Sequence, residues 1–341
     1  MGETLLEVKD LKVHFNTPDG IVRAVDGVSF AVRRGETLGI VGESGSGKSV
    51  TCLTVLRLIN LKTADVSGEI IFKGRDLLKL EKEDLRAIRG KELAMIFQDP
   101  FACLHPLYKV GEQLVEAILT HDDCSKAEAR TRAIDVLKAV GIPRPDQRID
   151  DYPHQYSGGM RQRAMIAMAL LHNPDLLIAD EPTTALDVTV QAQILELIDN
   201  IKRDYDIGVI LITHDLGVVA DVAQNVMVMY AGRSAELGDR DAVFQQPLHP
   251  YTWGLLESIP HLESKGIRLV PISGAPPSLI RVPPGCPFHP RCPHRFEPCD
   301  KEVPELTERG GGHPDACHLS IEEKRRLWTK REAGRTSRAA S

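Results

Sequence analysis

Residues 42–49 have the types and spacing needed to hold phosphate groups. They read Gly-Glu-Ser-Gly-Ser-Gly-Lys-Ser, which fits the pattern G-x-x-x-x-G-K-[ST]. The glycines let the backbone curl so that successive N–H groups point into one concavity, and a following helix N-terminus also favours an anion there. Lys48 can reach the β- and γ-phosphates of a nucleotide, and the Ser49 hydroxyl can bind Mg²⁺. A structural glycine turn is the alternative.

Residues 42–49 are called the phosphate loop below. The residues on either side of this loop distinguish nucleotide binding from a structural turn. Residues 36–41 are an apolar run of strand length, and residues 50–59 carry Leu53, Leu56 and Ile59 at helical spacing. Strand, glycine loop and helix in this order are the setting that a nucleotide site requires. The sequence therefore favours nucleotide binding over a structural turn.

Two carboxylates stand at the end of another apolar run. Residues 176–179 are apolar and are followed by Asp180 and Glu181. Such runs are typical of strands buried on both faces of a parallel sheet, and ligands bind at the carboxyl ends of these strands. Asp180 can bind Mg²⁺ through water, and Glu181 can act as a general base toward water. Two solvated loop acids are the weaker alternative beside a phosphate loop.

Three further side chains are candidates with open alternatives. Gln98 follows the apolar run 93–97 and could contact Mg²⁺ or the attacking water, although a Gln after a strand is often a solvated loop residue. His214 follows the run 208–213, where it could sense the γ-phosphate, although a single His is often simply a polar residue. Phe15 could stack on a purine ring or pack within a β-layer.

The remaining elements would position these residues. Residues 5–34 alternate apolar and polar side chains, which predicts an antiparallel β-layer. Residues 110–141 predict an inserted helical layer. Ser157 can cap a helix that begins with Gly158 and Gly159, and this is a second candidate for anion binding.

The composition limits the class of protein. A chain of 341 residues can form one large domain with a smaller one, and its net charge of −6 argues against a general nucleic-acid binder. No run approaches 18 apolar residues, and residues 1–4 do not begin a signal peptide. We therefore expect a soluble cytoplasmic protein whose seven cysteines are not paired as disulfides.

Four cysteines near the C-terminus suggest a metal site. The four residues are Cys286, Cys292, Cys299 and Cys317, with the spacing C-x₅-C-x₆-C-x₁₇-C. They could bind an iron–sulfur cluster, they could bind zinc, which the nearby histidines would favour, or they could be structural thiols. A zinc ribbon would show C-x₂-C pairs, which are missing here. The basic residues 324–341 predict a frayed, solvated tail, with attraction to anionic lipid as the alternative.

Taken in the order in which they occur along the chain, these motifs resemble those of the ATP-binding-cassette (ABC) ATPases over about residues 5–260. The resemblance implies an α/β P-loop NTPase fold with a mostly parallel core sheet, an antiparallel β subdomain and a helical subdomain. It implies catalytic roles for Glu181, His214 and Gln98, and Mg²⁺ binding by Ser49, Gln98 and Asp180. It assigns ATP contacts to Phe15, Gly42, Glu43, Ser44, Gly45, Ser46, Gly47, Lys48, Ser49 and Val50.

The same resemblance implies a dimer of cassettes. Each ATP would lie between one phosphate loop and the signature helix of the partner, so the trans contacts fall to Ser157, Gly158, Gly159 and Asp187. Most members have Leu before the signature Ser and Gln after its glycines, whereas this sequence has Tyr156 and Met160.

A finer resemblance is to the oligopeptide, dipeptide and nickel importer ATPases, carried by Gln98-Asp99-Pro100, His154, residues 247–252 and a long C-terminal extension. It implies ATP-driven uptake of di- or oligopeptides at the cytoplasmic face of the membrane, where the chain would be peripheral. The implied partners are two membrane permeases, a second and paralogous ABC ATPase, and an extracytoplasmic binding protein, with no nucleic acid. A [4Fe–4S] cluster in the extension is also implied.

The alternatives are an importer of another solute such as a nickel chelate, and a soluble ABC ATPase of DNA repair or translation. The soluble ABC ATPases usually carry a coiled-coil insertion or two cassettes, and this sequence has neither. An exporter cassette is a further alternative, but such cassettes are commonly fused to transmembrane helices, for which this sequence has no candidate. The expected domains are a nucleotide-binding domain at 1–260 with a helical subdomain at about 100–172, a Cys-rich extension at 261–323 and a basic tail at 324–341.

Overall fold

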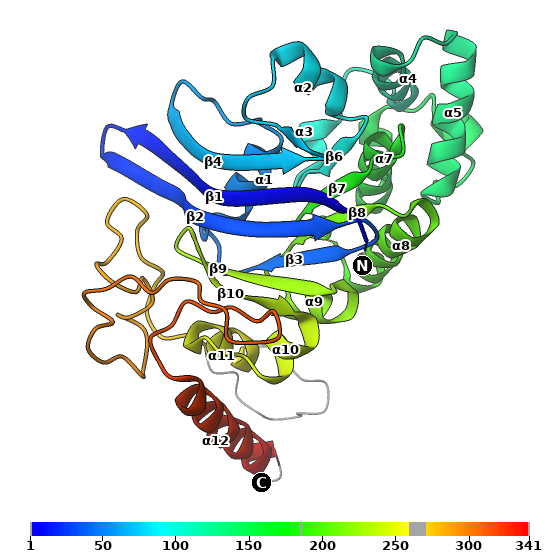
Figure 1. Ribbon diagram of the computed structural model, residues 1–341. Helices are drawn as coiled ribbons and strands as arrows, with labels where there is room; N and C mark the ends of the chain where they lie inside the picture. Colours follow the sequence, from blue (N-terminus) through cyan, green and yellow to red (C-terminus); the bar gives the residue numbers. More distant parts are fainter. Residues whose placement is uncertain (1, 185, 259–270, 340–341) are drawn as a thin grey trace. The chain divides into compact units, whose positions relative to one another are not determined.

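The computed structural model of the protein describes residues 2–184, 186–258 and 271–339 (Figure 1). The chain divides into two compact units, each built from segments that are far apart in the sequence. The first contains Met1–Leu6, Ala31–Thr37 and Ile71–Ile212; the second contains Glu7–Phe30, Leu38–Ile70 and Thr213–Ser341. The domains expected from the sequence are consecutive stretches of the chain, whereas these units are interleaved, and the expected boundaries stay predictions.

Parallel strands form the centre of the first unit. β7 (Leu176–Asp180) pairs with β6 (Leu93–Ile96) on one side and with β8 (Gly208–Ile212) on the other. Every residue of these strands is buried, which explains their continuous apolar sequences. The strands predicted at these runs are confirmed, and their carboxyl ends share one edge of the sheet.

Helices make up most of the rest of the first unit (Figure 1). The helices α4 (Val110–His121), α5 (Lys126–Ala139) and α7 (Gly158–Leu170) pack on one another through buried side chains such as Leu114, Ile118 and Leu137, which confirms the predicted helical layer. Ser125 begins α5 with a capping box, because its hydroxyl accepts from the Glu128 N–H and the Glu128 carboxylate accepts from the Ser125 N–H. The helices are α2 (Lys82–Ile88), α3 (Pro100–Cys103), α4 (Val110–His121), α5 (Lys126–Ala139), α6 (Pro145–Arg148), α7 (Gly158–Leu170) and α8 (Val188–Tyr205), with a 3₁₀ turn, η1 (Pro153–Gln155).

The second unit contains most of a β-layer. β1 (Thr4–Thr17) and β2 (Gly20–Arg33) form a hairpin, and β4 (Ala64–Phe72) lies on the other side of β1. The short strand β5 (Arg75–Asp76) pairs antiparallel with the end of β4. Alternate residues of β1 and β2 are buried, so the predicted antiparallel layer is confirmed.

The phosphate loop belongs to the second unit and follows its most buried strand. β3 (Thr37–Val41) runs parallel to β9 (Asn225–Tyr230), which pairs antiparallel with β10 (Arg233–Asp239). A core of side chains from β9, β10 and the following helices, including Val228, Val243 and Tyr251, packs beside them. The helices of this unit are α1 (Lys48–Val55), α9 (Leu216–Val222), α10 (Arg240–Gln245), α11 (Pro250–Glu257) and α12 (Ile321–Ala339).

The last helix of the chain differs from the solvated tail that the sequence predicted at residues 324–341. Residues 271–320 have little regular structure, but α12 follows and packs on the unit. Lys324 is fully buried and donates to Asp315 at 2.6 Å, Trp328 is buried beside Trp253 of α11, and Arg331 pairs with a carboxylate of α11. The prediction of a frayed tail is therefore wrong for these turns. Spacings of four and three residues place the three side chains on one helical face, which a count of basic residues does not show.

No helix within the described ranges is both long and apolar enough to cross a membrane.

Candidate functional site

The phosphate loop connects β3 to α1, as the sequence predicted, and glycine is required at two of its positions. Gly42 and Gly47 have φ angles of 152° and 101°. A Cβ on Gly42 would lie 2.2 Å from the Met229 carbonyl oxygen, and one on Gly47 would lie 2.3 Å from the Ala24 carbonyl oxygen. Larger residues would push the loop off the strands, so the glycines fix its close approach.

Lys48 places a positive charge at this loop. Its ammonium group donates to the carbonyl oxygens of Gly42 at 2.8 Å and Glu43 at 3.0 Å, and the residue is buried. Ser49 and Val50 follow it in the first turn of α1 and are half-buried. A lysine held across a curled backbone at a helix N-terminus suits a polyphosphate.

In the first unit, two of the predicted catalytic side chains, Gln98 and Glu181, meet at the carboxyl edge of β6, β7 and β8. The Gln98 side-chain amide donates to the Glu181 carboxylate at 3.0 Å, and the Thr184 hydroxyl donates to the same oxygen at 2.9 Å. Asp180, the last residue of β7, is buried. Glu181 has a left-handed backbone (φ 45°) held by its N–H bond to the Ile212 carbonyl oxygen. Such backbone is uncommon for Glu and is often found at functional sites.

The Thr184 contact is absent from the sequence predictions. The only signal for it is that Thr184 lies three residues after Glu181, where a tight turn can bring the side chains together. The nearby Gln162 donates to the Pro182 carbonyl oxygen at 2.6 Å from α7, so the turn after Glu181 is supported on both sides.

The signature segment forms an exposed helix N-terminus. Ser157 caps α7, its hydroxyl accepting from the Met160 N–H at 3.2 Å, and a Cβ on Gly158 would meet no atom within 4 Å. Gly159 follows in the first turn. Tyr156 is buried and donates to the Arg148 carbonyl oxygen, so this departure from the family pattern is a core residue.

The three remaining candidates are Asp187, His214 and Phe15. Asp187 is exposed and caps α8 by accepting from the Val190 N–H at 3.0 Å. His214 is exposed and follows β8, in the second unit with the half-buried Phe15 of β1. The predicted roles of these residues toward ATP and Mg²⁺ stay predictions.

The prediction of an iron–sulfur cluster, and of a metal at the four cysteines in general, is wrong. Among the described residues, no group of three or more His, Cys, Asp or Glu side chains is arranged to hold a metal ion. Burial raises the pKa of the Cys286 and Cys292 thiols to about 11 and that of the Cys317 thiol to about 12, which disfavours the thiolate that binds metals.

The surroundings of these residues give the physical reason. Cys286 belongs to the apolar core with Phe288 and Tyr251. Of the nearby histidines, His313 contacts the Glu236 carboxylate at 2.7 Å and His289 contacts the Cys286 carbonyl oxygen at 3.0 Å. The cysteines and histidines that lie close together in the sequence therefore serve the packing of this segment.

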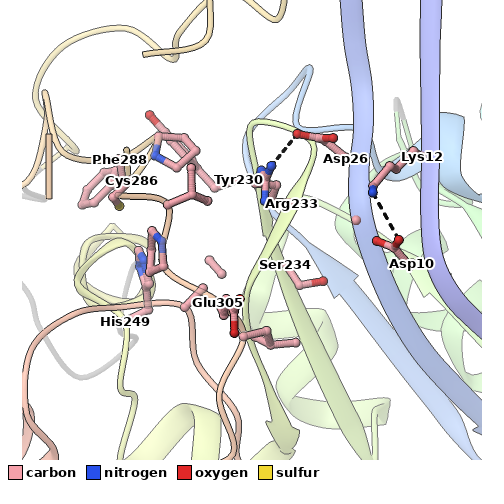
Figure 2. A pocket seen from close by; sticks show the side chains of 17 residues that line it. Asp10, Lys12, Asp26, Tyr230, Arg233, Ser234, His249, Cys286, Phe288 and Glu305 are labelled. Carbon is pink, nitrogen blue, oxygen red and sulfur yellow. Dashed lines mark hydrogen bonds and ion pairs between the residues drawn. The ribbon is translucent and has the colours of Figure 1, made fainter. Parts of the chain in front are cut away.

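A separate cavity of about 400 Å³, which the sequence did not predict, lies within the second unit. Figure 2 shows the side chains that line it. Four of its charged side chains form two pairs: Arg233 donates to Asp26 at 2.6 Å, and Lys12 lies 3.2 Å from Asp10. It contains none of the residues predicted to bind ATP.

Comparison with protein families gives two matches. Residues 25–184 match the model described as "ABC transporter", and residues 235–299 match "Oligopeptide/dipeptide transporter, C-terminal region". The second match includes most of β10, all of α10 and α11, and three of the four cysteines.

Individual proteins agree with these matches. The chain is 55% identical to the dipeptide transport ATP-binding protein DppD of Bacillus subtilis (strain 168), over 93% of this chain and 95% of that protein. It is 52% identical to the oligopeptide transport ATP-binding protein OppD of Salmonella typhimurium, over 94% and 96%. Among solved structures, the dimeric bacterial ABC transporter cassette MJ0796 has a TM-score of 0.62 at 27% identity, covering 69% of this chain and 99% of that one. The chain therefore belongs to the ABC transporter family of ATPases, in the branch of the oligopeptide and dipeptide transport ATP-binding proteins.

Proposed function

We propose that this chain is the ATP-hydrolysing subunit of an importer that takes up di- or oligopeptides. The observation that carries the proposal is the 55% identity to a dipeptide transport ATP-binding protein over 93% of the chain. Similar proteins named for peptide import, such as one of Brucella abortus (strain 2308) at 51% identity, support the same cargo.

The chain's own groups suit ATP and Mg²⁺. The glycine backbone and Lys48 of the phosphate loop provide N–H groups and a cation for phosphate oxygens. Ser49, Gln98 and Asp180 provide the oxygen ligands that Mg²⁺ prefers. When bound, Mg²⁺ would neutralise phosphate charge during transfer to water.

Glu181 is the proposed general base. Bonds from Gln98 and Thr184 to one oxygen of its carboxylate fix the orientation of the group. A carboxylate held in this way can accept a proton from a water molecule directed at the γ-phosphate. Gln98 would report the occupancy of the site to the segment that follows it.

Hydrolysis is proposed to require a second cassette. Ser157, Gly158 and Gly159 present an exposed helix N-terminus, which suits the phosphates of a nucleotide held by a partner. Asp187 would approach the same nucleotide. We propose that this partner is a paralogous ATPase rather than a second copy of the chain.

The remaining partners follow from the proposed cargo. Two membrane permeases and an extracytoplasmic binding protein would complete the importer, with this chain peripheral at the cytoplasmic face. The chain's C-terminal part, residues 261–323, would be an extension specific to this branch, which the match at 235–299 supports.

Replacement of Glu181 by Gln tests the catalytic proposal. Glu181→Gln should retain ATP binding and lose turnover, because the amide keeps the size of the side chain but cannot accept the proton. Glu196→Gln, on the exposed side of α8, is the matched control and should hydrolyse ATP like the wild type. Unchanged phosphate release by Glu181→Gln would contradict the assignment.

Reconstitution tests the cargo. The ATPase, purified with its permeases and binding protein in vesicles, should accumulate a labelled dipeptide or oligopeptide when ATP is supplied to the ATPase side. Uptake of a nickel chelate without peptide uptake would favour the alternative solute. A fully soluble particle without permeases would favour a soluble ABC ATPase.

A further inference from the structure

The second residue of the phosphate loop, Glu43, is held by the C-terminal part of the chain. Its carboxylate accepts two bonds from the Arg291 guanidinium, Nη1 to Oε2 at 2.6 Å and Nη2 to Oε1 at 2.9 Å. Its N–H donates to the Tyr251 hydroxyl at 2.8 Å. Its carbonyl oxygen accepts from Lys48. All of these residues lie in the second unit, so every polar group of Glu43 has a partner there.

Arg291 is itself fixed by its surroundings. Its side chain is 5% exposed, and its Nε and Nη2 donate to the carbonyl oxygens of Ser273 and Ile272 at 3.0 and 3.3 Å. The guanidinium also lies over the Tyr230 and Phe288 rings, 5.8 and 5.9 Å from their centroids. The bond with Glu43 is the largest cause that raises the pKa of Arg291 above its usual value, so the residue stays charged.

The charges explain why this contact matters for a polyanion. A carboxylate on the phosphate loop would repel the phosphates of ATP, because like charges at short range cost free energy. A bidentate Arg–carboxylate pair neutralises that charge and fixes the direction in which the carboxylate points. The ligand-binding loop therefore depends on a side chain 248 positions later in the sequence.

We propose that Arg291 is a positioning residue for ATP binding: it neutralises Glu43 and holds the phosphate loop, so that the C-terminal segment sets the affinity of the loop for nucleotide. The inference rests on the proposed function of the phosphate loop as the ATP site.

Equilibrium binding of a fluorescent ATP analogue with Mg²⁺ to the full chain tests the inference. Arg291→Ala should weaken binding by about tenfold, the loss expected for one strong charge-assisted hydrogen bond. Adding Glu43→Gln to Arg291→Ala should restore most of the affinity, because the repelling carboxylate is then gone. Arg295→Ala, an exposed arginine of the same segment, is the matched control and should bind like the wild type.

A structural role alone would not change the salt dependence of binding. The affinity difference between Arg291→Ala and the wild type should shrink as ionic strength rises, because salt screens the exposed carboxylate from the phosphates. If Arg291→Ala does not fold, Arg291→Lys is measured in its place. This variant keeps the positive charge but cannot donate two parallel hydrogen bonds to the Glu43 carboxylate, so binding should weaken about threefold.

Lys48→Ala separates the two ideas. If Lys48→Ala binds the analogue like the wild type, the proposed ATP site is wrong. If Lys48→Ala loses binding while folded Arg291→Ala or Arg291→Lys binds like the wild type, only the role of Arg291 is overturned. A loss in Arg291→Ala that neither Glu43→Gln nor salt relieves would also overturn it.

Discussion

The phosphate loop and the C-terminal segment, residues 271–339, belong to the same unit but are fixed by different kinds of contact. In the loop, glycines at 42 and 47 and a lysine at 48 determine the shape within eight residues. In the C-terminal segment, the shape depends on side chains that meet from distant positions, such as Arg331 with Glu257. Because Arg291 of the C-terminal segment pairs with Glu43 of the loop, a local motif has a partner that is far away in the sequence.

Breaking the buried ion pair of the C-terminal segment should have the largest effect on stability. Asp315 is fully buried and accepts from Lys324 at 2.6 Å and Arg309 at 3.1 Å. Asp315→Asn leaves the buried Lys324 charge uncompensated, so the free energy of unfolding should fall by ~3–5 kcal/mol. Urea unfolding measures this change.

Two further variants sharpen this prediction. Asp300→Asn, at an exposed site of the same segment, should change the unfolding free energy little. Adding Lys324→Met to Asp315→Asn should recover part of the loss, because the unpaired cation is removed. Equal stability of Asp315→Asn and the wild type would show that the pair does not hold the segment.

Removing the lysine of the phosphate loop should affect activity rather than folding. Lys48→Ala should reduce ATP hydrolysis by ~10²–10³-fold, the loss typical of one charge-stabilising group, with little change in unfolding free energy. Phosphate release measures the rate, and Lys62→Ala at an exposed site is the control. A large loss of stability in Lys48→Ala would contradict the expectation that the loop lysine serves activity and the C-terminal ion pair serves stability.

A weaker link joins the phosphate loop to α11, before the C-terminal segment, through the Tyr251 hydroxyl and the Glu43 N–H. Tyr251→Phe removes the acceptor for this N–H, so the KM for ATP should rise about fivefold, equivalent to ~1 kcal/mol. The kcat should change little, because neither group contacts the reacting atoms. Tyr205→Phe, at an exposed tyrosine of α8, should leave KM unchanged, and an equal KM in Tyr251→Phe would argue against the link.

An exposed ion pair should have the smallest effect. Bonds from Arg132 and then Lys91 lower the pKa of Asp122 to about 2. This carboxylate contributes stability above its unfolded-state pKa of about 3.9, and the contribution is lost as the pH falls through about 2. At pH 7, Asp122→Asn should cost less than ~1 kcal/mol, because the pair is partly exposed.

Thermal unfolding at several pH values measures this effect. The difference in Tm between Asp122→Asn and the wild type should shrink as the pH falls from about 5 toward 2. Asp123→Asn, the exposed neighbour, should show no such trend. A cost as large as that of Asp315→Asn would mean that burial does not distinguish the two pairs.

The elements that position the site could be predicted where the signal is local. The run before Asp180 predicted a buried strand because apolar side chains are needed on both faces, and the glycines of the phosphate loop predicted its turn. The contact of Arg291 with Glu43 could not be predicted, because nothing near either residue marks the other as a partner. The wrong prediction of a metal at the four cysteines has a similar cause. Their spacing can be read from the sequence, but the apolar core that surrounds Cys286 cannot.

Hydrogen–deuterium exchange of the backbone amides of residues 42–49 tests most directly whether the C-terminal segment holds the phosphate loop. Exchange reports local opening without requiring ATP. In Arg291→Ala, the amides of this loop should exchange faster than in the wild type, while those of β7 should be unchanged. Equal exchange of the loop in the two proteins would contradict the account.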